Sequence, residues 1–528
     1  MAFGDGVLRR GFGGAGDRFR ALLDVEHPPL GLVTLTVMLG MIMAIIDSTI
    51  VNVALQTMAG NLGATTDEIA WVVTAYILAN VVIMPLNGWL TAMFGRQKYY
   101  ATSLAFFTIS SFLCGIAGSL PLLVIFRVLQ GLGGGALQPT AQSILFESYP
   151  PQQRGKAMAI FGLGAMVGPA IGPVLGGYIV DNYNWPLIFF INVPIGIVAF
   201  AMTFLFLRDP AYIEKPKGRI DWNGLVLMTV GLSALQYVLE RGQREDWFSS
   251  GTIVILSLVS GVALVWFIVQ ELRSKNPVVD LQVFRSRTFT AGNIIAIVSG
   301  FGLFGLNLVL PLFFQQVLGF SPLQAGLALL PGALATAVSM PIAGRFVNKV
   351  DPRLMIASGI IAFGVGSWAM GGLDQYAGYW DIFWPRALQG FALGFLFVPL
   401  STATLSDIPR GELAAASGMY TLLRQLGGSL GIAVLATLLE RREDAAQSAL
   451  AGNVTLASPV IRNFLNAPAT HAHALQQLNA MVQINALVIS YDFLFRFSAI
   501  LFFISLPTLL LLRPPKGHGA RAPVPAAE

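Results

Sequence analysis

The stretch "IIDSTIVNVAL", residues 45–55, places a single carboxylate inside an apolar segment. From Leu30 to Leu55, Asp47 is the only charged residue. A carboxylate at the centre of a bilayer costs about 2.5 to 3.5 kcal/mol on insertion scales. Because such a residue needs a partner or a function, Asp47 is the first candidate functional residue of the chain.

Long apolar stretches like this one recur from end to end. The chain has 528 residues, of which 55% are hydrophobic and 11% are charged, against about 25% charged residues in soluble domains. About 20 apolar residues cross a bilayer as a helix. The sequence therefore predicts an all-α polytopic membrane protein with fourteen spans, at 30–55, 69–91, 99–118, 122–146, 156–179, 187–207, 223–240, 252–270, 289–315, 324–344, 354–373, 384–406, 414–440 and 491–512.

The basic residues predict how the spans are oriented. If the N-terminus is cytoplasmic, most of the 32 Lys and Arg residues fall on the cytoplasmic side. The opposite side then holds only Arg241, Arg244, Arg441, Arg442 and Arg462. This bias follows the positive-inside rule and predicts that both termini are cytoplasmic. It also argues against a nucleic-acid partner, despite the net charge of +5.

The two halves of the chain repeat one another weakly. "FRVLQG" (126–131) matches "PRALQG" (385–390), and "RGKAMA" (154–159) matches "RGELAA" (410–415). Two parallel six-helix repeats are typical of secondary transporters, whose site lies near the bilayer midplane. We expect a cytoplasmic segment (1–29), an N-terminal six-helix bundle (30–207), an inserted helix pair (208–288), a C-terminal six-helix bundle (289–512) with a long outer loop at about 441–490, and a cytoplasmic tail (513–528).

Glycines and prolines are regularly spaced in the fifth span, "GLGAMVGPAIGPVLGGY" (162–178). Glycines at every fourth position share one helix face and let a neighbouring helix approach closely. Each proline removes a backbone hydrogen bond and bends the helix. The residues of this pattern are Gly164, Gly168, Pro169, Gly172, Pro173, Gly176 and Gly177.

This string resembles the antiporter motif of the major facilitator superfamily. "FRVLQGLGGG" (126–135) is similar to the family's arginine motif in the fourth span, and "IDSTIVNVAL" (46–55) to the first-span motif of its fourteen-helix drug:proton antiporters. "YPPQQRGKAMAI" (149–160) and "NPVVDLQVFRSRTFTAGN" (276–293) resemble segments of EmrB-type multidrug exporters. The resemblance covers nearly the whole chain and implies the fourteen-helix major facilitator fold.

Three charged residues are candidates for proton coupling: Asp47, Arg127 and Glu147. The charge of a buried carboxylate depends on its solvation and on nearby cations, so alternating access can change it. The repeat has no acid opposite Asp47 in "FGLFGLNLVLP" (301–311), which favours a coupling role over symmetric packing. The resemblance implies that Arg127 modulates Asp47 electrostatically. A purely structural role, shared with the copy Arg386, is the alternative.

The turn after the second span, "GWLTAMFGRQK" (88–98), is similar to the superfamily's gating-loop motif. It keeps Gly88, Gly95, Arg96 and Lys98, but Ala92 stands where most members have aspartate. A charge relay through that aspartate is therefore in doubt here. Polar residues in other spans are candidates for the substrate pathway, with core packing as the alternative: Asn52, Tyr76, Asn80, Gln138, Asn307, Gln315 and Arg424.

The sequence predicts no metal or cofactor site and no enzyme. His471 and His473 are two residues apart without an accompanying carboxylate or cysteine cluster, and hydrolase and nucleotide-binding motifs are missing. The segment "ALQQLNAMVQINALVI" (474–489) has helical periodicity and predicts a surface helix. EmrB-type exporters work with a periplasmic EmrA-type adaptor and an outer-membrane TolC-type channel, so the resemblance implies these partners.

Together these features predict a proton-driven multidrug antiporter of the bacterial inner membrane. It would export hydrophobic or amphipathic compounds by alternating access, with the proton motive force as its energy source. One alternative is a dedicated exporter of one metabolite, fatty acid or siderophore. The other is a membrane receptor that transports nothing.

Overall fold

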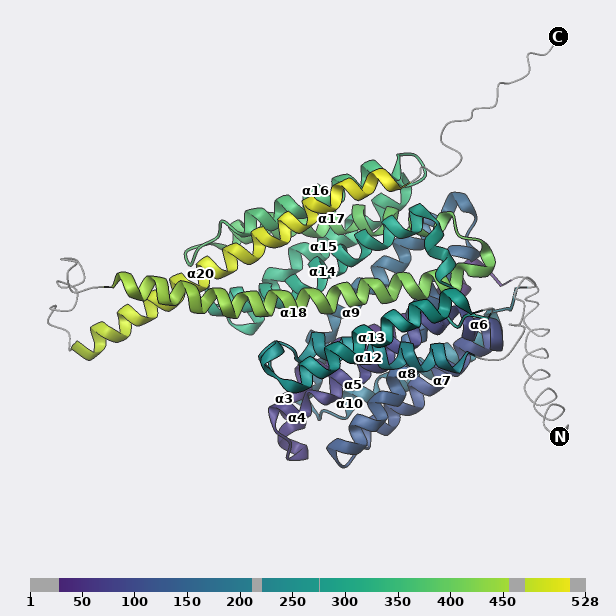
Figure 1. Cartoon of the computed structure of the whole chain (residues 1–528), viewed down its shortest axis with the longest axis horizontal. Coiled ribbons are helices and arrows are strands. Elements are labelled where there is room, and N and C mark those ends of the chain that lie inside the picture. The colour runs from purple at the N-terminus through teal and green to yellow at the C-terminus, as the bar shows by residue number, and fades with distance from the viewer. Residues whose placement is uncertain (1–27, 211–220, 275, 455–470, 513–528) are drawn as a thin grey trace, which may run out of the picture. The chain divides into compact units, whose positions relative to one another are not determined.

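The computed structural model describes residues 28–210, 221–274, 276–454 and 471–512. In these ranges the chain is helical and has no strand (Figure 1). Thirteen helical segments there are long and apolar enough to cross a membrane. The prediction of an all-α polytopic membrane protein is thus confirmed. The predicted tail and almost all of the predicted N-terminal segment lie outside the described residues.

The predicted third span, 99–118, is helical but is not among those thirteen. It corresponds to α7 (Arg96–Gly115). Its first turn contains Arg96, Gln97 and Lys98, and several serines and threonines follow, so its mean hydropathy is low. α7 nevertheless packs against α8 (Leu120–Ser148) and α11 (Asn192–Phe206). With α7 added to the thirteen, the described residues contain fourteen long helices.

The chain forms two compact units. Unit 1 comprises Met1–Val238, Val254–Ser286 and Leu405–Leu422, and unit 2 comprises Leu239–Ile253, Arg287–Thr404 and Leu423–Glu528. Besides α7, α8 and α11, the helices of unit 1 are α3 (Leu30–Leu62), α4 (Thr66–Ile69), α5 (Trp71–Ile83), α6 (Asn87–Phe94), α9 (Arg154–Asn182), α10 (Leu187–Phe190) and most of α12 (Trp222–Arg241) and α13 (Gly251–Arg273).

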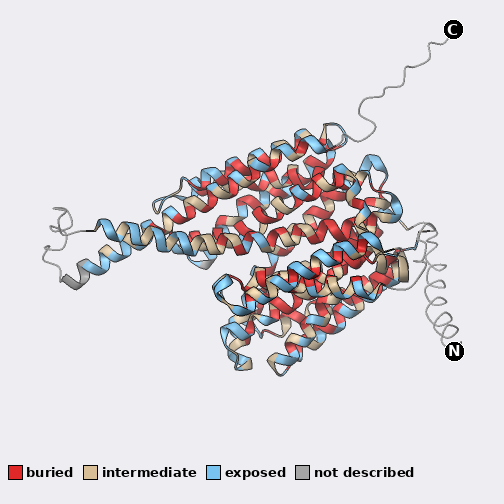
Figure 2. Ribbon diagram, viewed as in Figure 1, coloured by how far each residue is buried: buried red, intermediate tan, exposed pale blue. Residues whose placement is uncertain are grey.

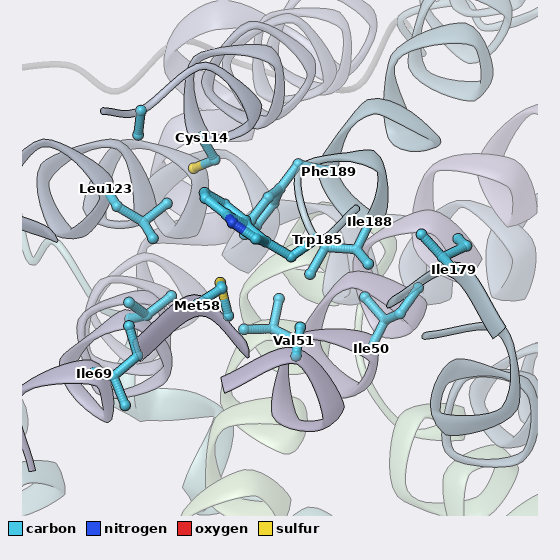
Figure 3. Packing of buried hydrophobic residues seen from close by; sticks show 13 residues of the cluster. Ile50, Val51, Met58, Ile69, Cys114, Leu123, Ile179, Trp185, Ile188 and Phe189 are labelled. Atoms are coloured by element: carbon cyan, nitrogen blue, oxygen red, sulfur yellow. The ribbon is translucent and has the colours of Figure 1, made fainter. Parts of the chain in front are cut away.

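α3 is packed between other helices of unit 1. The apolar residues of this 33-residue helix lie on several of its faces, as expected of a helix that is covered by other helices. It packs against α9, α8 and α11. A cluster of buried side chains fills the space beside its C-terminal half, where Val51 and Met58 lie near Cys114, Trp185 and Phe189 (Figure 3).

Unit 2 contains α14 (Arg287–Gln316), α15 (Pro322–Phe346), α16 (Pro352–Met370), α17 (Tyr379–Ser406), most of α18 (Leu413–Asn453) and α20 (His471–Ser505). α20 packs along α16 and α14. Stacked rings of Phe363 and Phe502, 4.2 Å between centroids, lie in the contact between α16 and α20. Figure 2, coloured by burial, shows buried residues along these helices.

Where the structure describes it, the long outer loop predicted at about 441–490 is helical. α18 continues to Asn453 and α20 begins at His471, and both extend beyond the other helices of unit 2 (Figure 1). Alanine, glutamine and glutamate in "REDAAQSALAG" (442–452) favour helix, so α18 does not stop at the end of its apolar segment. The segment 474–489 is helical as predicted, but it is continuous with the last span. Residues 455–470 and the side chains of His471 and His473 lie outside the description.

Candidate functional site

Asp47 and Arg127 form a buried ion pair within unit 1. Asp47 lies in the middle of α3 and Arg127 in the second turn of α8. The distance between Arg127 Nη1 and Asp47 Oδ2 is 2.6 Å, and the side chains are 1% and 0% exposed. Because neither charge reaches solvent, each depends on the other and on its hydrogen bonds for stabilisation.

Two amides complete the surroundings of the carboxylate. Gln130 Nε2 donates to Asp47 Oδ1 over 2.9 Å, and Asn192 Nδ2 donates to the same oxygen over 2.8 Å. Gln130 lies one turn after Arg127 on α8, and Asn192 is the first residue of α11. Three donors from α8 and α11 therefore hold the two carboxylate oxygens of Asp47 in place.

The guanidinium of Arg127 is held on several sides. Its Nε donates to the carbonyl of Val72 over 3.0 Å, and Nη1 also donates to Gln130 Oε1 over 2.7 Å. Its carbon lies 4.1 Å from the ring centroid of Tyr76, a cation–π geometry. Tyr76, which the sequence placed in the substrate pathway, therefore contacts the ion pair.

Further hydrogen bonds connect this cluster to α7. Asn192 Nδ2 lies 3.0 Å from Ser111 Oγ, and Ser111 Oγ donates to the carbonyl of Phe189 over 2.9 Å. We call Asp47, Arg127, Gln130, Asn192 and Ser111 the Asp47 network. The sequence predicted its two charged members, whereas Gln130, Asn192 and Ser111 were missed. The signal for Gln130 was its place in the repeated strings "RVLQG" and "RALQG".

The glycine face of α9 lies directly against the part of α3 that carries Asp47. A Cβ atom at Gly168 would overlap Ile45, and one at Gly172 would overlap Thr49. Thr49 Oγ1 also lies 3.0 Å from the carbonyl oxygen of Gly168. Gly164 and Gly176 face α3 in the same way, while Pro169 and Pro173 lie inside α9. Gly177 has only Val53 near it, at 3.9 Å.

Glu147 belongs to a different ion pair. It lies near the end of α8 and pairs with Arg96 of the gating-loop motif. Twenty residues separate it from Arg127 on one helix, which at 1.5 Å per residue is about 30 Å. Glu147 therefore lies too far along α8 to pair with Asp47, and its part in proton coupling stays a prediction.

The other gating-loop residues have different surroundings. Gly88 packs against Ala415, where a Cβ would overlap that residue. Gly95 has φ of 82°, a left-handed conformation that glycine adopts without strain. Lys98 is exposed. The loop thus keeps a tight turn, and Arg96 finds its carboxylate on α8 although Ala92 replaces the usual aspartate.

Unit 2 repeats part of the Asp47 network without its acid. Arg386 Nη1 donates to Gln389 Oε1 over 2.7 Å, as Arg127 does to Gln130, and Gln389 Nε2 donates to Ser367 Oγ over 3.0 Å. Asn307 follows Asn52 by 255 residues, close to the offsets of 256 and 259 between the repeated strings. This alignment places Gly302 at the position of Asp47. Gly302 packs against Phe502.

The remaining predicted pathway residues are in varied surroundings. Asn80 is buried beside Gly134 and Gly135. Arg424 is buried, with its guanidinium 5.0 Å from the ring centroid of Phe397. Three of the others are exposed and one is half-buried: Asn52, Asn307, Gln315 and Gln138. Among the described residues, no group of three or more His, Cys, Asp or Glu side chains could hold a metal ion.

A family model for the Major Facilitator Superfamily matches residues 37–432. The chain belongs to this superfamily. This superfamily protein is 38% identical over 514 residues to the fatty acid resistance protein FarB of Neisseria gonorrhoeae, a match that covers 94% of this chain and 99% of FarB. It is 37% identical over 500 residues to the multidrug export protein EmrB of Escherichia coli K12, with 94% and 98% covered. The resemblance to EmrB-type exporters is thereby confirmed.

Solved structures support the same fold. The human organic anion transporter MFSD10 (TETRAN) aligns with a TM-score of 0.63 at 14% identity, covering 92% of this superfamily protein and 100% of that chain. The proton:xylose symporter XylE aligns with a TM-score of 0.58 at 13% identity, covering 90% and 95%. At these identities the likeness concerns the fold alone.

Proposed function

We propose that this superfamily protein is a proton-coupled multidrug efflux antiporter of the bacterial inner membrane, with Asp47 as its proton-carrying residue. The observation that carries the proposal is the fully buried ion pair between Asp47 and Arg127. The identity to the multidrug export protein EmrB supports export of several drugs, and in this proposal these are hydrophobic or amphipathic compounds.

Protonation of Asp47 is the step that couples the proton to a change of conformation. A neutral Asp47 no longer balances the charge of Arg127, and the acceptor for Gln130 and Asn192 loses its charge. The arrangement of α3, α8 and α11 that suits the ionised carboxylate is then less favourable. A conformation with different affinities for proton and drug is populated instead, which is the condition for coupled transport.

The surroundings of α3 suit such a change. The glycine face of α9 presents little side-chain bulk to α3, so the two helices can shift along one another with few rotamer changes. The copy of the network in unit 2 keeps the Arg386–Gln389 pair but has no acid. In this proposal, coupling therefore depends on one unit.

Proton-driven uptake of a fluorescent dye into inverted membrane vesicles tests the proposal. Asp47→Asn should abolish uptake that depends on a pH gradient, because the amide carries no titratable proton. Asp181→Asn, which changes an exposed carboxylate at the end of α9, is the matched control and should transport normally. Uptake by Asp47→Asn with an unchanged pH dependence would overturn the coupling role. Failure of wild-type vesicles to move any compound would favour a receptor.

A dedicated fatty acid exporter is the second candidate, because FarB is as similar to this chain as EmrB is. A panel of dyes, cationic drugs and long-chain fatty acids separates the two functions. Competition by chemically unrelated compounds would favour multidrug export. Transport confined to fatty acids would favour the dedicated exporter.

The proposal includes an EmrA-type adaptor and a TolC-type channel as partners, with both termini in the cytoplasm. The parts of α18 and α20 beyond the spans predicted at 414–440 and 491–512 offer a helical surface for such an adaptor. Cysteines placed on these extensions should cross-link to a co-expressed adaptor, whereas a cysteine at Lys98 should not. A fluorescent protein fused to the C-terminus should fold and fluoresce only if that end is cytoplasmic.

A further inference from the structure

Unit 2 has a pocket on the face formed by α16, α18 and α20. Its volume is about 360 Å³, within the range of roughly 300–1,000 Å³ usual for small-molecule sites. One face of α20 forms most of the wall, because residues three and four apart share a helix face. The lining residues are Trp368, Arg442, Ile489, Asp492, Phe493, Arg496, Phe497 and Ile500.

The wall of the pocket is apolar and aromatic. Phe493 and Phe497 stack one turn apart on α20, with 6.1 Å between ring centroids and 19° between ring planes. Trp368 of α16 is 47% exposed and Ile489 of α20 is 50% exposed. Exposed aromatic and branched side chains on membrane-crossing helices contact the acyl chains and glycerol region of lipids.

Two arginines stand beside this apolar wall, with one carboxylate between them. Arg496 Nε lies 2.6 Å from Asp492 Oδ1, and its Nη2 donates over 3.4 Å to the carbonyl of Gly371 at the end of α16. Arg442 lies over the ring of Phe493, 3.8 Å from its centroid. In the part of the chain that the structure describes, Arg442 has no carboxylate partner. The pocket therefore carries one excess positive charge.

The position of Arg442 along α18 places this charge at the edge of the bilayer. It lies 29 residues after Leu413, where α18 begins, which is roughly 44 Å along the helix axis. A bilayer including its head groups is about 40–45 Å thick. The apolar wall then points into the bilayer, while the guanidinium of Arg442 lies at head-group level.

We infer that this pocket binds an anionic phospholipid of the surrounding bilayer, with its phosphodiester at Arg442 and Arg496 and an acyl chain along Phe493 and Phe497. Guanidinium groups bind phosphate oxygens in bidentate geometry. The single negative charge of a phosphodiester balances the excess charge of the pocket. The side chains of Asp492 and Arg496 remain paired, so Arg442 is the residue that selects for the anion.

Native mass spectrometry of the full-length protein in detergent tests the inference. The probes are palmitoyl-oleoyl phosphatidylglycerol and palmitoyl-oleoyl phosphatidylcholine, added separately at equal concentration. Wild type should retain the phosphatidylglycerol adduct preferentially. Arg442→Gln should weaken that binding about tenfold, as expected for loss of a charge-assisted contact, and should leave phosphatidylcholine binding unchanged.

Arg441→Gln is the matched control, because it removes the same charge from an exposed neighbour that does not line the pocket. It should bind phosphatidylglycerol as wild type does, and Arg442→Lys should restore part of the binding. Elution of each variant as a single species from a sizing column controls for folding. Equal phosphatidylglycerol binding by wild type and Arg442→Gln would overturn the inference.

A fatty acid is the other amphiphile to examine. Palmitate that binds through Arg442 more tightly than phosphatidylglycerol would also overturn the inference and assign the pocket to a free carboxylate. The measurement needs no proton gradient, so its outcome is independent of whether the protein exports drugs.

Discussion

The side chains of Asp47 and Arg127 join α3 to α8 through an ion pair of 2.6 Å that has almost no contact with solvent. Such a pair is weak evidence for stability, because burying both charges offsets much of their attraction. Removing one partner lowers the stability of the folded protein, because the other charge then remains buried without compensation. A substitution of either residue should therefore destabilise any conformation of unit 1 in which the pair is formed.

Arg127→Gln is expected to destabilise the protein by about 3–5 kcal/mol, because it leaves the Asp47 carboxylate buried and unpaired. The double variant Asp47→Asn/Arg127→Gln should recover part of this loss, since it contains neither charge. Thermal unfolding in detergent, followed by tryptophan fluorescence, measures both. Additive effects of the two substitutions would contradict the coupling of the two side chains.

Gly168→Ala should abolish transport, because the added methyl group meets Ile45 on α3 and separates α9 from α3 next to Asp47. Gly177→Ala is the matched control on the same helix. Its Cβ would come no closer than 3.9 Å to Val53, so the variant should transport like wild type. Vesicle uptake at equal expression compares the two, and similar losses in both would refute the role of close packing.

Arg96→Glu and Glu147→Arg should each impair transport, because each leaves a charge of the gating-loop pair unmatched. The exchange Arg96→Glu/Glu147→Arg should restore it if the pair is structural. If Glu147 instead carries protons, the exchange cannot restore transport, since arginine does not release its proton in proteins. Dye uptake by the three variants therefore decides whether Glu147 belongs to the coupling machinery.

The charged part of the site could be predicted from the sequence, whereas its neutral part could not. A charge in an apolar span has a large cost, so Asp47 and Arg127 stand out. The neutral members do not stand out: Gln130, Asn192 and Ser111. Amide and hydroxyl side chains are common in membrane helices, where they can form hydrogen bonds with backbone groups of their own helix. Their arrangement around Asp47 depends on how α7, α8 and α11 pack on α3, which no single segment specifies.

The fold, like the site, could be predicted from the sequence only in part. Apolar stretches located the helices and their order, since each span must satisfy its backbone internally. They failed where helix and membrane boundaries differ: α18 and α20 continue past their apolar segments, and α7 begins with charged residues. The ion pair of Glu147 was missed because Glu147 was grouped with Asp47 as an acidic residue. The distance along α8 separates the two sites, since Glu147 lies about 30 Å from Arg127.

Asp221 should make the stability of the inserted helix pair depend on pH. It precedes α12 and accepts hydrogen bonds from the Gly224 amide over 2.9 Å and from Gln270 of α13 over 3.1 Å. Burial raises the pKa of this carboxyl, but the hydrogen bonds outweigh burial and hold the pKa below its ordinary value of 3.8.

A carboxyl with a lowered folded-state pKa contributes stability above its unfolded-state pKa, and this contribution is lost as the pH falls through the folded-state pKa. Asp221→Asn is therefore expected to lower the unfolding temperature at neutral pH and to unfold with a shallower decline below about pH 4. Unfolding temperatures of both proteins across the acid range measure this. Parallel pH curves would show that Asp221 contributes nothing to it.

Arg386 and Arg127 occupy corresponding places in the two repeats, yet within the described ranges only Arg127 of the two faces a carboxylate. Substituting each arginine by glutamine therefore distinguishes a structural role from a role in proton coupling. Arg127→Gln should change the pH dependence of dye uptake, because the proposed proton carrier Asp47 loses its ion-pair partner. Arg386→Gln should lower the amount of folded protein or the rate of uptake while its pH profile stays that of wild type. Uptake at a series of pH values, normalised to the protein in the vesicles, measures both quantities. A pH profile shifted equally by the two substitutions would mean that the arginines act alike, and the asymmetry between the repeats would then have no part in coupling.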